Sequence, residues 1–175
     1  MRQSILSCLL VLALELCSGG GLAQEQKPST QEQDPLAQMH LPYGVSVGLA
    51  DAKRAADAAI ALARNNNWTM AVAITDVGGE LIYLEKMDGT QTASVQVALD
   101  KTRSAALYRR PTKAFQDALA QGGENLRILA LRGAVPVDGG NPLIVDGKIV
   151  GAIGVSGGIG HQDGQCSLAG AAALH

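Results

Sequence analysis

NPLIVDGKIVGAIGVS, residues 141–156, is the stretch that sets the fold, since two apolar runs flank the dipeptide Asp146-Gly147. An Asp-Gly pair between apolar runs is a strong signal for a β-hairpin with a type I′ turn, because both turn residues then adopt positive φ. We therefore predict two antiparallel strands, over residues 141–145 and 148–156.

A second hairpin is predicted upstream, from residues 69–76 (TMAVAITD) and 81–87 (LIYLEKM). The connection between them, VGGE, holds paired glycines that suit a tight turn. Shorter strand-like runs follow at residues 126–131 and 135–137. Because hairpins dominate, the sheet is expected to be mainly antiparallel.

Four helices are predicted around this sheet. Over residues 46–66 apolar side chains recur at helical spacing, and the run Asn65-Asn66-Asn67 ends the helix. The many alanines of this helix predict close packing on a flat partner, most simply the sheet. Further helices are predicted over 93–108, 112–121 and 165–174. The fold class is thus mixed α/β, of the α+β type in which helices flank an antiparallel sheet.

The first residues have the composition of an export signal. Arg2 precedes an apolar run over residues 5–16, and small residues lie before a predicted cleavage site after Ala23. We expect residues 1–23 to be removed and the chain to be periplasmic or secreted. A lipoprotein anchored through Cys17 is the alternative. The apolar run is too short to span a bilayer, so no stable membrane anchor is expected.

The remainder divides into a tether and one domain. Residues 24–42 are rich in Gln, Glu and Pro and are predicted to be a flexible tether, with the folded domain over 43–175. A formal net charge of −2 gives no electrostatic footprint for nucleic acid. After cleavage Cys166 is the only thiol, either a buried small side chain or a reactive or ligating group.

The glycine-rich stretch at the end of the hairpin over residues 141–156 fits the G-x-S-x-G pattern of a hydrolase at residues 154–158. His161 follows three residues later. Only 17 residues follow Gly158, and His161 is too near along the chain to fold back as an independent base. The pattern is better explained by backbone corners where neighbouring elements approach closely. Ser156 is expected to cap or turn the backbone, and Asp163 to cap the last helix.

A metal site has few ligands to draw on. His161, Asp163 and Cys166 lie near one another in sequence and could bind one ion, but a structural zinc site usually needs four such groups. A solvated His161 is the favoured interpretation.

Five cations crowd residues 101–113, a stretch that includes the end of one predicted helix and the start of the next: Lys101, Arg103, Arg109, Arg110 and Lys113. The first helix ends before Pro111 and the next begins at Thr112. Cations beside free backbone N–H groups at a helix start could hold carboxylates. The alternative is an ordinary solvated basic face, and the residues alone leave both open.

Four segments together resemble the GlcG/HbpS family of haem-binding or haem-degrading domains, which also occurs as the C-terminal domain of PduO-type proteins. The matching segments are AVAITDVGGELIYLEKMDG at 71–89, DKTRSAALYRRPT at 100–112, GAVPVDGGNPLIVDGKIVGAIGVSGG at 133–158 and QDGQCSLAGAAAL at 162–174. The resemblance implies a profilin-like fold with a five-stranded antiparallel sheet between helices. It also implies homo-oligomers.

The resemblance further implies haem as the cofactor. A threonine in a Pro-Thr step is implicated at the haem in this family, and Pro111-Thr112 matches that step, which places Thr112 near the iron. Lys101, Arg109 and Arg110 are then candidate partners of the propionates, and His161 or Cys166 a secondary ligand. A histidine on the first helix is also implicated, but residues 46–66 contain none, and His40 just upstream is the candidate substitute.

The leading functional hypothesis is therefore an exported, homo-oligomeric haem-binding protein, with haem degradation as a further activity. One alternative is a protein of a catabolic pathway that binds a small organic acid, or shifts a proton on it, with the same basic cluster. Another is a structural oligomer without a ligand. Whether the protein is an enzyme is left open.

Overall fold

The hairpin predicted at Asp146-Gly147 is present in the computed structural model, which describes residues 37–174. Strands β3 (Gly140–Val145) and β4 (Lys148–Ser156) pair antiparallel. The turn residues Asp146 and Gly147 have φ of 50° and 69°, as a type I′ turn requires. The turn prediction is confirmed. The predicted signal peptide and most of the predicted tether lie outside the described residues.

The second hairpin is also confirmed, with β1 (Ala71–Thr75) pairing antiparallel with β2 (Leu81–Lys86). β1 also pairs antiparallel with β4, which gives the strand order β2-β1-β4-β3. The antiparallel sheet flanked by helices is thus as predicted. The number of strands is not, because the sheet within residues 37–174 has four strands and not five.

The difference lies in residues 126–131 and 135–137, which form no strand. The first run belongs to a 3₁₀ helix, η2 (Gly123–Ala130), and its hydrogen bonds are local, such as Leu131 N–H to the Ile128 carbonyl. The strand prediction was wrong because the apolar pattern LRILAL shows only which side chains are apolar. It does not show whether the backbone has a strand to pair with, and here no strand of the sheet pairs with it.

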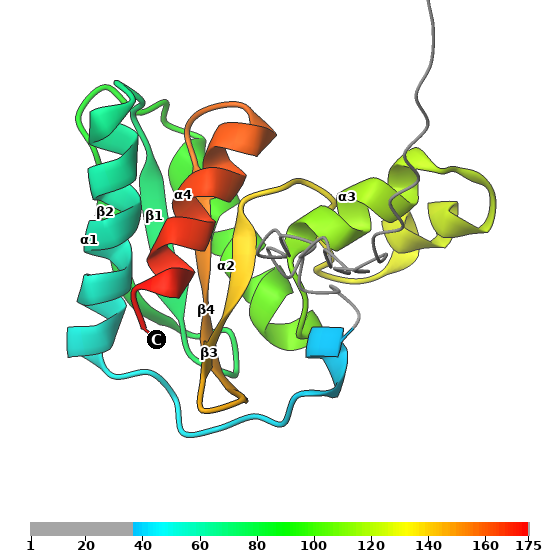
Figure 1. Ribbon diagram of the computed structural model, residues 1–175. Coiled ribbons are helices and arrows are strands. Elements are labelled where there is room, and N and C mark those ends of the chain that lie inside the picture. The colour runs from blue at the N-terminus through cyan, green and yellow to red at the C-terminus, as the bar shows by residue number, and fades with distance from the viewer. Residues whose placement is uncertain (1–36, 175) are drawn as a thin grey trace, which may run out of the picture. The chain divides into compact units, whose positions relative to one another are not determined.

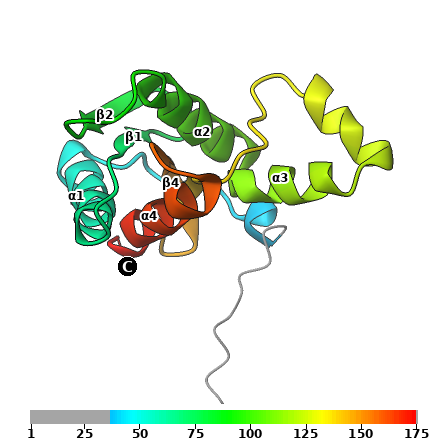
Figure 2. The ribbon, with the colours of Figure 1, turned by 90° about the horizontal axis from the view of Figure 1, so that it is seen from above.

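Helices cover both faces of the sheet (Figure 1). Helix α2 (Ser94–Tyr108) lies on one face, and α1 (Leu49–Asn65) and α4 (Gly160–Ala172) lie together on the other, as the view from above also shows (Figure 2). Helix α3 (Thr112–Ala120) and η2 lie to one side of the sheet, next to the end of α2. No helix within residues 37–174 is long and apolar enough to cross a bilayer.

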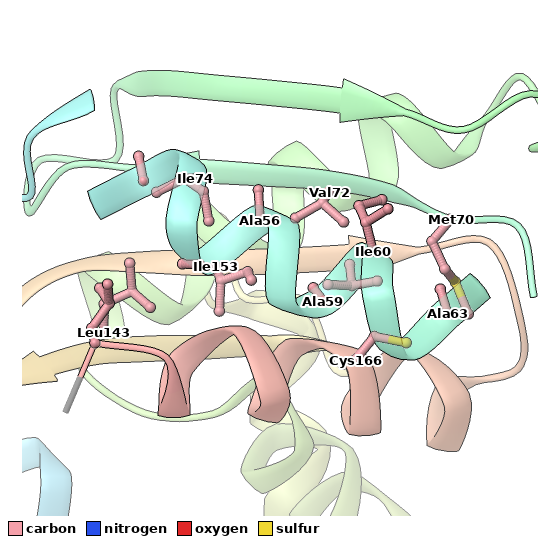
Figure 3. Packing of buried hydrophobic residues seen from close by; sticks show 14 of the residues in the cluster. Ala56, Ala59, Ile60, Ala63, Met70, Val72, Ile74, Leu143, Ile153 and Cys166 are labelled. Carbon is pink, nitrogen blue, oxygen red and sulfur yellow. The ribbon is translucent and has the colours of Figure 1, made fainter. Parts of the chain in front are cut away.

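The two faces of the sheet differ in side-chain size. Large side chains such as Val72, Ile74 and Ile153 pack against the alanines of α1 and against Cys166 of α4 (Figure 3). On the face under α2, strands β1 and β4 carry small residues instead: Ala71, Ala73, Ala152 and Gly154. The predicted close packing of the alanine-rich first helix is confirmed, since Ala52, Ala55, Ala56, Ala59 and Ala63 are all buried.

Gly154 shows how near α2 comes to the sheet. A Cβ at this position would overlap the carbonyl oxygen of Ala98 and lie 2.6 Å from the amide nitrogen of Thr102. Only a residue without a side chain allows that approach. The glycine of the apparent hydrolase motif is thus a packing position, as the sequence predicts. Ser156 does not cap or turn: it is buried at the end of β4 and donates to Ser94 Oγ at 3.3 Å.

The last helix begins earlier than predicted, at Gly160 rather than near residue 165. Asp163 therefore does not precede the helix but lies in its first turn, where its Oδ1 accepts a hydrogen bond from Gly158 N–H at 3.0 Å. Gln162 Oε1 accepts another from Ile159 N–H at 3.1 Å. These two side chains satisfy donors at the helix start, which explains the early beginning.

Candidate functional site

The junction between α2 and α3 contains most of the residues that the sequence singles out. Helix α2 ends at Tyr108, and Arg109 adopts left-handed geometry, with φ of 52° and ψ of 40°. Pro111 is the N-cap of α3, and Thr112 is its first residue. A left-handed residue followed by a proline turns the chain sharply, so the predicted helix break is confirmed.

Arg109 and Arg110 are held over different aromatic rings at this junction. The Arg109 guanidinium lies 5.5 Å from the centre of the Tyr43 ring, and the Arg110 guanidinium lies 4.9 Å from the centre of the Phe115 ring. Phe115 in turn meets Tyr108 edge to face, with the ring centres 5.1 Å apart. Stacking on a ring face orients a guanidinium and leaves its N–H edge available for a further partner.

Burial lowers the pKa of the Arg110 guanidinium from its ordinary value. Arginine nevertheless remains protonated in proteins. Arg110 Nε donates to the Tyr108 carbonyl at 3.2 Å, and Arg109 Nη1 donates to the Leu41 carbonyl at 3.3 Å. Each guanidinium has five N–H donors, so both retain donors beyond these contacts.

The segment that leads into the domain lies against the same junction. Besides the contact between Leu41 and Arg109, Tyr43 Oη donates to the Ala106 carbonyl near the end of α2, at 2.9 Å. The short helix η1 (Ala37–His40) ends immediately before Leu41, and His40 is exposed. The fold thus brings Leu41, the residue next to His40, to Arg109, a proximity that sequence spacing alone does not reveal.

Thr112 is fully buried and belongs to the interior of the junction. Its hydroxyl accepts a hydrogen bond from Gly140 N–H at 2.9 Å. A Cβ on Gly140 would lie 2.6 Å from the Thr112 methyl group and 2.5 Å from the Lys101 carbonyl oxygen, so only glycine allows β3 to come this close to α2 and α3. Thr112 therefore ties the start of α3 to the start of β3, and its hydroxyl is already engaged.

Lys101 is separated from the arginines and lies in the core. Its Nζ donates to Asp163 Oδ2 at 2.7 Å and to the Val155 carbonyl at 3.0 Å, and both charged side chains are buried. Burial raises the pKa of Asp163, and the hydrogen bond from Lys101 opposes that effect. The pair links α2, β4 and α4. In this conformation Lys101 is not exposed to a ligand at the surface.

The other two cations of the predicted cluster also lie apart. Arg103 Nε donates to the Gly79 carbonyl at 3.2 Å, and Lys113 forms an exposed ion pair with Asp117 along α3. The five cations therefore do not converge. Arg109 and Arg110 are the two of these cations that lie over aromatic rings at the junction.

Asp138 is a buried polar residue that the sequence reasoning missed. Its Oδ1 accepts from Gly139 N–H at 2.7 Å, and its own N–H donates to Gln116 Oε1 at 2.9 Å. Burial raises the pKa of its carboxyl group. The carboxylate lies so close to Gly164 of α4 that a Cβ there would overlap it. The only sequence signal is its place before the Gly139-Gly140 pair.

The predicted secondary ligands are not assembled into a site. His161 is exposed on the first turn of α4 and its ring contacts Gln165 at 3.1 Å, whereas Cys166 is buried among apolar side chains. Burial raises the pKa of the Cys166 thiol to about 11. Among residues 37–174 no three His, Cys, Asp or Glu side chains come together as metal ligands do. Of the two interpretations of Cys166, the buried side chain is the one observed.

Comparisons with known proteins agree with this fold. A family model described as "Haem degrading protein HbpS-like" matches residues 47–172. Protein GlcG of Escherichia coli K12 is 38% identical over 94 residues, which are 54% of this chain and 69% of that protein.

Two solved structures are similar over most of the domain. A double mutant of Streptomyces reticuli HbpS has a TM-score of 0.69 and 30% identity, and the match covers 77% of this chain and 91% of that one. A structure described as a PduOC:heme complex has a TM-score of 0.67 and 25% identity, with 75% of this chain and 96% of that one covered.

Proposed function

We propose that this chain, which belongs to the HbpS-like family, binds haem at the surface where α2 meets α3. The family description and the haem complex of a structural neighbour support haem as the ligand. The observation that carries the location is the pair of adjacent arginines, each held over an aromatic ring.

The arginine pair and the ring beside it suit the two chemical parts of haem, its propionates and its apolar porphyrin. Haem carries two propionate carboxylates on an apolar ring system, and guanidinium groups form strong, charge-assisted hydrogen bonds with carboxylates. Arg109 and Arg110 supply these donors. The ring of Tyr43, which is 43% exposed, supplies apolar surface for the porphyrin, whereas the buried ring of Phe115 only holds Arg110 in place. Lys101, engaged by Asp163, supports the proposal only by fixing α2 in place.

His40 is the first candidate for a ligand of the iron. Imidazole is a common axial ligand of haem iron, and His40 is exposed next to the residue that Arg109 contacts. We assign Thr112 a positioning role, because its hydroxyl accepts from Gly140 and holds the start of α3. Thr112 would meet the iron only if α3 moved away from β3. His161 remains a secondary candidate, since its ring is exposed.

The proposal also includes self-association, which the resemblance to the GlcG/HbpS family implies, and export of the chain. The composition of residues 1–23 supports cleavage after Ala23. N-terminal sequencing of the protein recovered from a bacterial periplasm or culture medium should therefore begin at Gln24. A chain that keeps Met1 there would contradict export with cleavage.

Hemin titration tests the proposed site. Added to the chain of residues 24–175, hemin should give a Soret band, and Arg109→Ala with Arg110→Ala should weaken binding at least tenfold. The matched control is Arg54→Ala with Arg64→Ala, which removes two exposed arginines from α1. His40→Ala should shift the position of the Soret band. Spectra unchanged up to excess hemin would sink the proposal.

The same arginine pair favours a second candidate, a small organic acid as the ligand. A planar guanidinium binds a carboxylate through two parallel hydrogen bonds whether or not a porphyrin is attached. Thermal-shift measurements with small carboxylates separate the two, because only this candidate predicts stabilisation without hemin.

Loss of the Soret band on incubation with ascorbate and oxygen would add haem degradation to haem binding.

A further inference from the structure

We infer that residues 112–137, here called the arm, form the surface through which two copies of this chain associate. The arm consists of α3, η2 and the segment that follows η2. The inference rests on the self-association included in the proposed function, and it names the surface responsible.

The arm has little interior of its own. In α3 only Thr112 and Phe115 are buried, and in η2 only Ile128 is buried. Figures 1 and 2 show both elements to one side of the sheet, away from the layers that α1, α2 and α4 form with it. One side of the arm is therefore covered by the domain, and the other is not.

An apolar ridge runs along the uncovered side. A 3₁₀ helix has three residues per turn, so side chains three apart lie directly above one another. Leu126 and Leu129 of η2 are related in this way and are 54% and 68% exposed. Ile128, one residue earlier than Leu129, points inward and is buried. Leu131 and Val137 add two further exposed apolar side chains to the arm.

The exposed apolar side chains of the arm are of the kind that contact a second protein chain. Soluble monomers rarely expose contiguous apolar patches beyond a few hundred Å², and such patches commonly mark interaction sites. A standard interface uses roughly 20–30 residues and about 800 Å² from each partner. Only the exposed side chains of the arm, on the side away from the domain, are available to such a partner.

The charges of the arm favour a second copy as the occupant. In a two-fold contact each chain presents the same surface, so that surface must be complementary to itself. If Leu126 of one copy packs on Leu129 of the other in antiparallel register, Glu124 of one faces the region of Arg132 of the other. Within residues 37–174 neither Glu124 nor Arg132 forms an ion pair through its side chain.

This mixture of charges argues against an acidic membrane as the occupant. Membrane-surface segments carry clusters of Lys and Arg, whereas the arm carries Asp117 and Glu124 among its cations. A lipid surface thus lacks the complementarity that a second copy has.

Sedimentation velocity of the chain of residues 24–175 tests the inference. The unmodified chain should associate, and Leu126→Asp with Leu129→Asp should weaken self-association at least tenfold. The matched control is Leu49→Asp with Leu81→Asp, which charges two leucines that are similarly exposed (52% and 47%) on other elements. The control should keep the mass of the unmodified chain. An unmodified chain that is monomeric, or an arm variant that keeps its mass, would overturn the inference.

Charge reversal provides a second test that does not depend on the leucine variants folding. Glu124→Arg alone should weaken association, and Glu124→Arg combined with Arg132→Glu should restore it. Failure of restoration would contradict the antiparallel register. Hemin titration separates this inference from the proposed haem binding. The arm variant, Leu126→Asp with Leu129→Asp, should lose self-association and keep hemin binding. The arginine variant, Arg109→Ala with Arg110→Ala, should lose hemin binding and keep the mass of the unmodified chain.

Discussion

Lys101 Nζ lies 2.7 Å from Asp163 Oδ2, and this buried pair joins the middle of α2 to the first turn of α4. The two residues come from opposite faces of the sheet, where β4 contributes the Val155 carbonyl as a second acceptor. Removal of one partner leaves the other as an uncompensated buried charge, which is far more costly than the pair itself.

Lys101→Met should therefore lower the free energy of unfolding by about 3–5 kcal/mol. The control is Lys113→Met, which breaks an exposed pair with Asp117 and should cost less than about 1 kcal/mol. Urea unfolding followed by circular dichroism measures both. Equal losses in the two variants would contradict a buried, stabilising partner for Asp163.

The buried carboxyl of Asp138 should make stability depend on pH. Its pKa is raised above the ordinary value of 3.8, so the native state takes up the proton before the unfolded state does. The unfolded state then binds fewer protons between 3.8 and the raised value, and the free energy of unfolding falls as pH rises through this window. Asp163, also raised, acts in the same direction.

Asp138→Asn isolates this effect, because an amide oxygen can still accept from Gly139 N–H. Urea unfolding from pH 4 upward should give a shallower fall in stability for the variant than for the unmodified chain. Parallel curves for the two proteins would show that Asp138 titrates alike in the native and unfolded states.

Gly154→Ala should destabilise the fold, because the added Cβ collides with the backbone of α2 at Ala98 and Thr102. Overpacking of this kind costs roughly 1–3 kcal/mol or more. Gly160→Ala is the matched control, since its Cβ would find only ordinary contacts, the nearest at 3.6 Å, within a helix. Thermal unfolding should show a lower midpoint for the first variant and an unchanged or higher one for the second.

Thr112→Val tests the link between α3 and β3. Valine keeps the shape but not the hydroxyl, so Gly140 N–H loses its buried acceptor, at a cost of about 1–3 kcal/mol. Thr112→Ser keeps the acceptor and should retain most of the stability. Hydrogen exchange of the Gly140 amide should accelerate in the valine variant alone. A fully protected amide in that variant would contradict the proposed role of the hydroxyl.

The sequence predicts the parts of this fold that are governed by neighbouring residues. Asp146-Gly147 encodes its turn locally, and Pro111 ends a helix by its own geometry. The strand predicted over residues 126–131 is absent, because an apolar run becomes a strand only if another strand of the sheet is free to pair with it.

The candidate site was predictable only in part. The sequence draws attention to Arg109 and Arg110 through their charge, but Lys101 is paired with a residue 62 positions away, which no local pattern reveals. The same holds for the contact between Leu41 and Arg109. Long-range contacts decide which cations remain at the surface and which enter the core.

Because its two faces carry side chains of different size, the sheet should respond differently to substitutions on each face. Where α1 and α4 rest on large side chains, exchange of Ile for Val or Leu changes the packing between the sheet and those helices. At Gly154 no side chain intervenes, because the backbone of α2 meets this residue directly. Substitutions in the core under α1 and α4 therefore do not act directly on the contact that places α2, and with it Arg109, against β4.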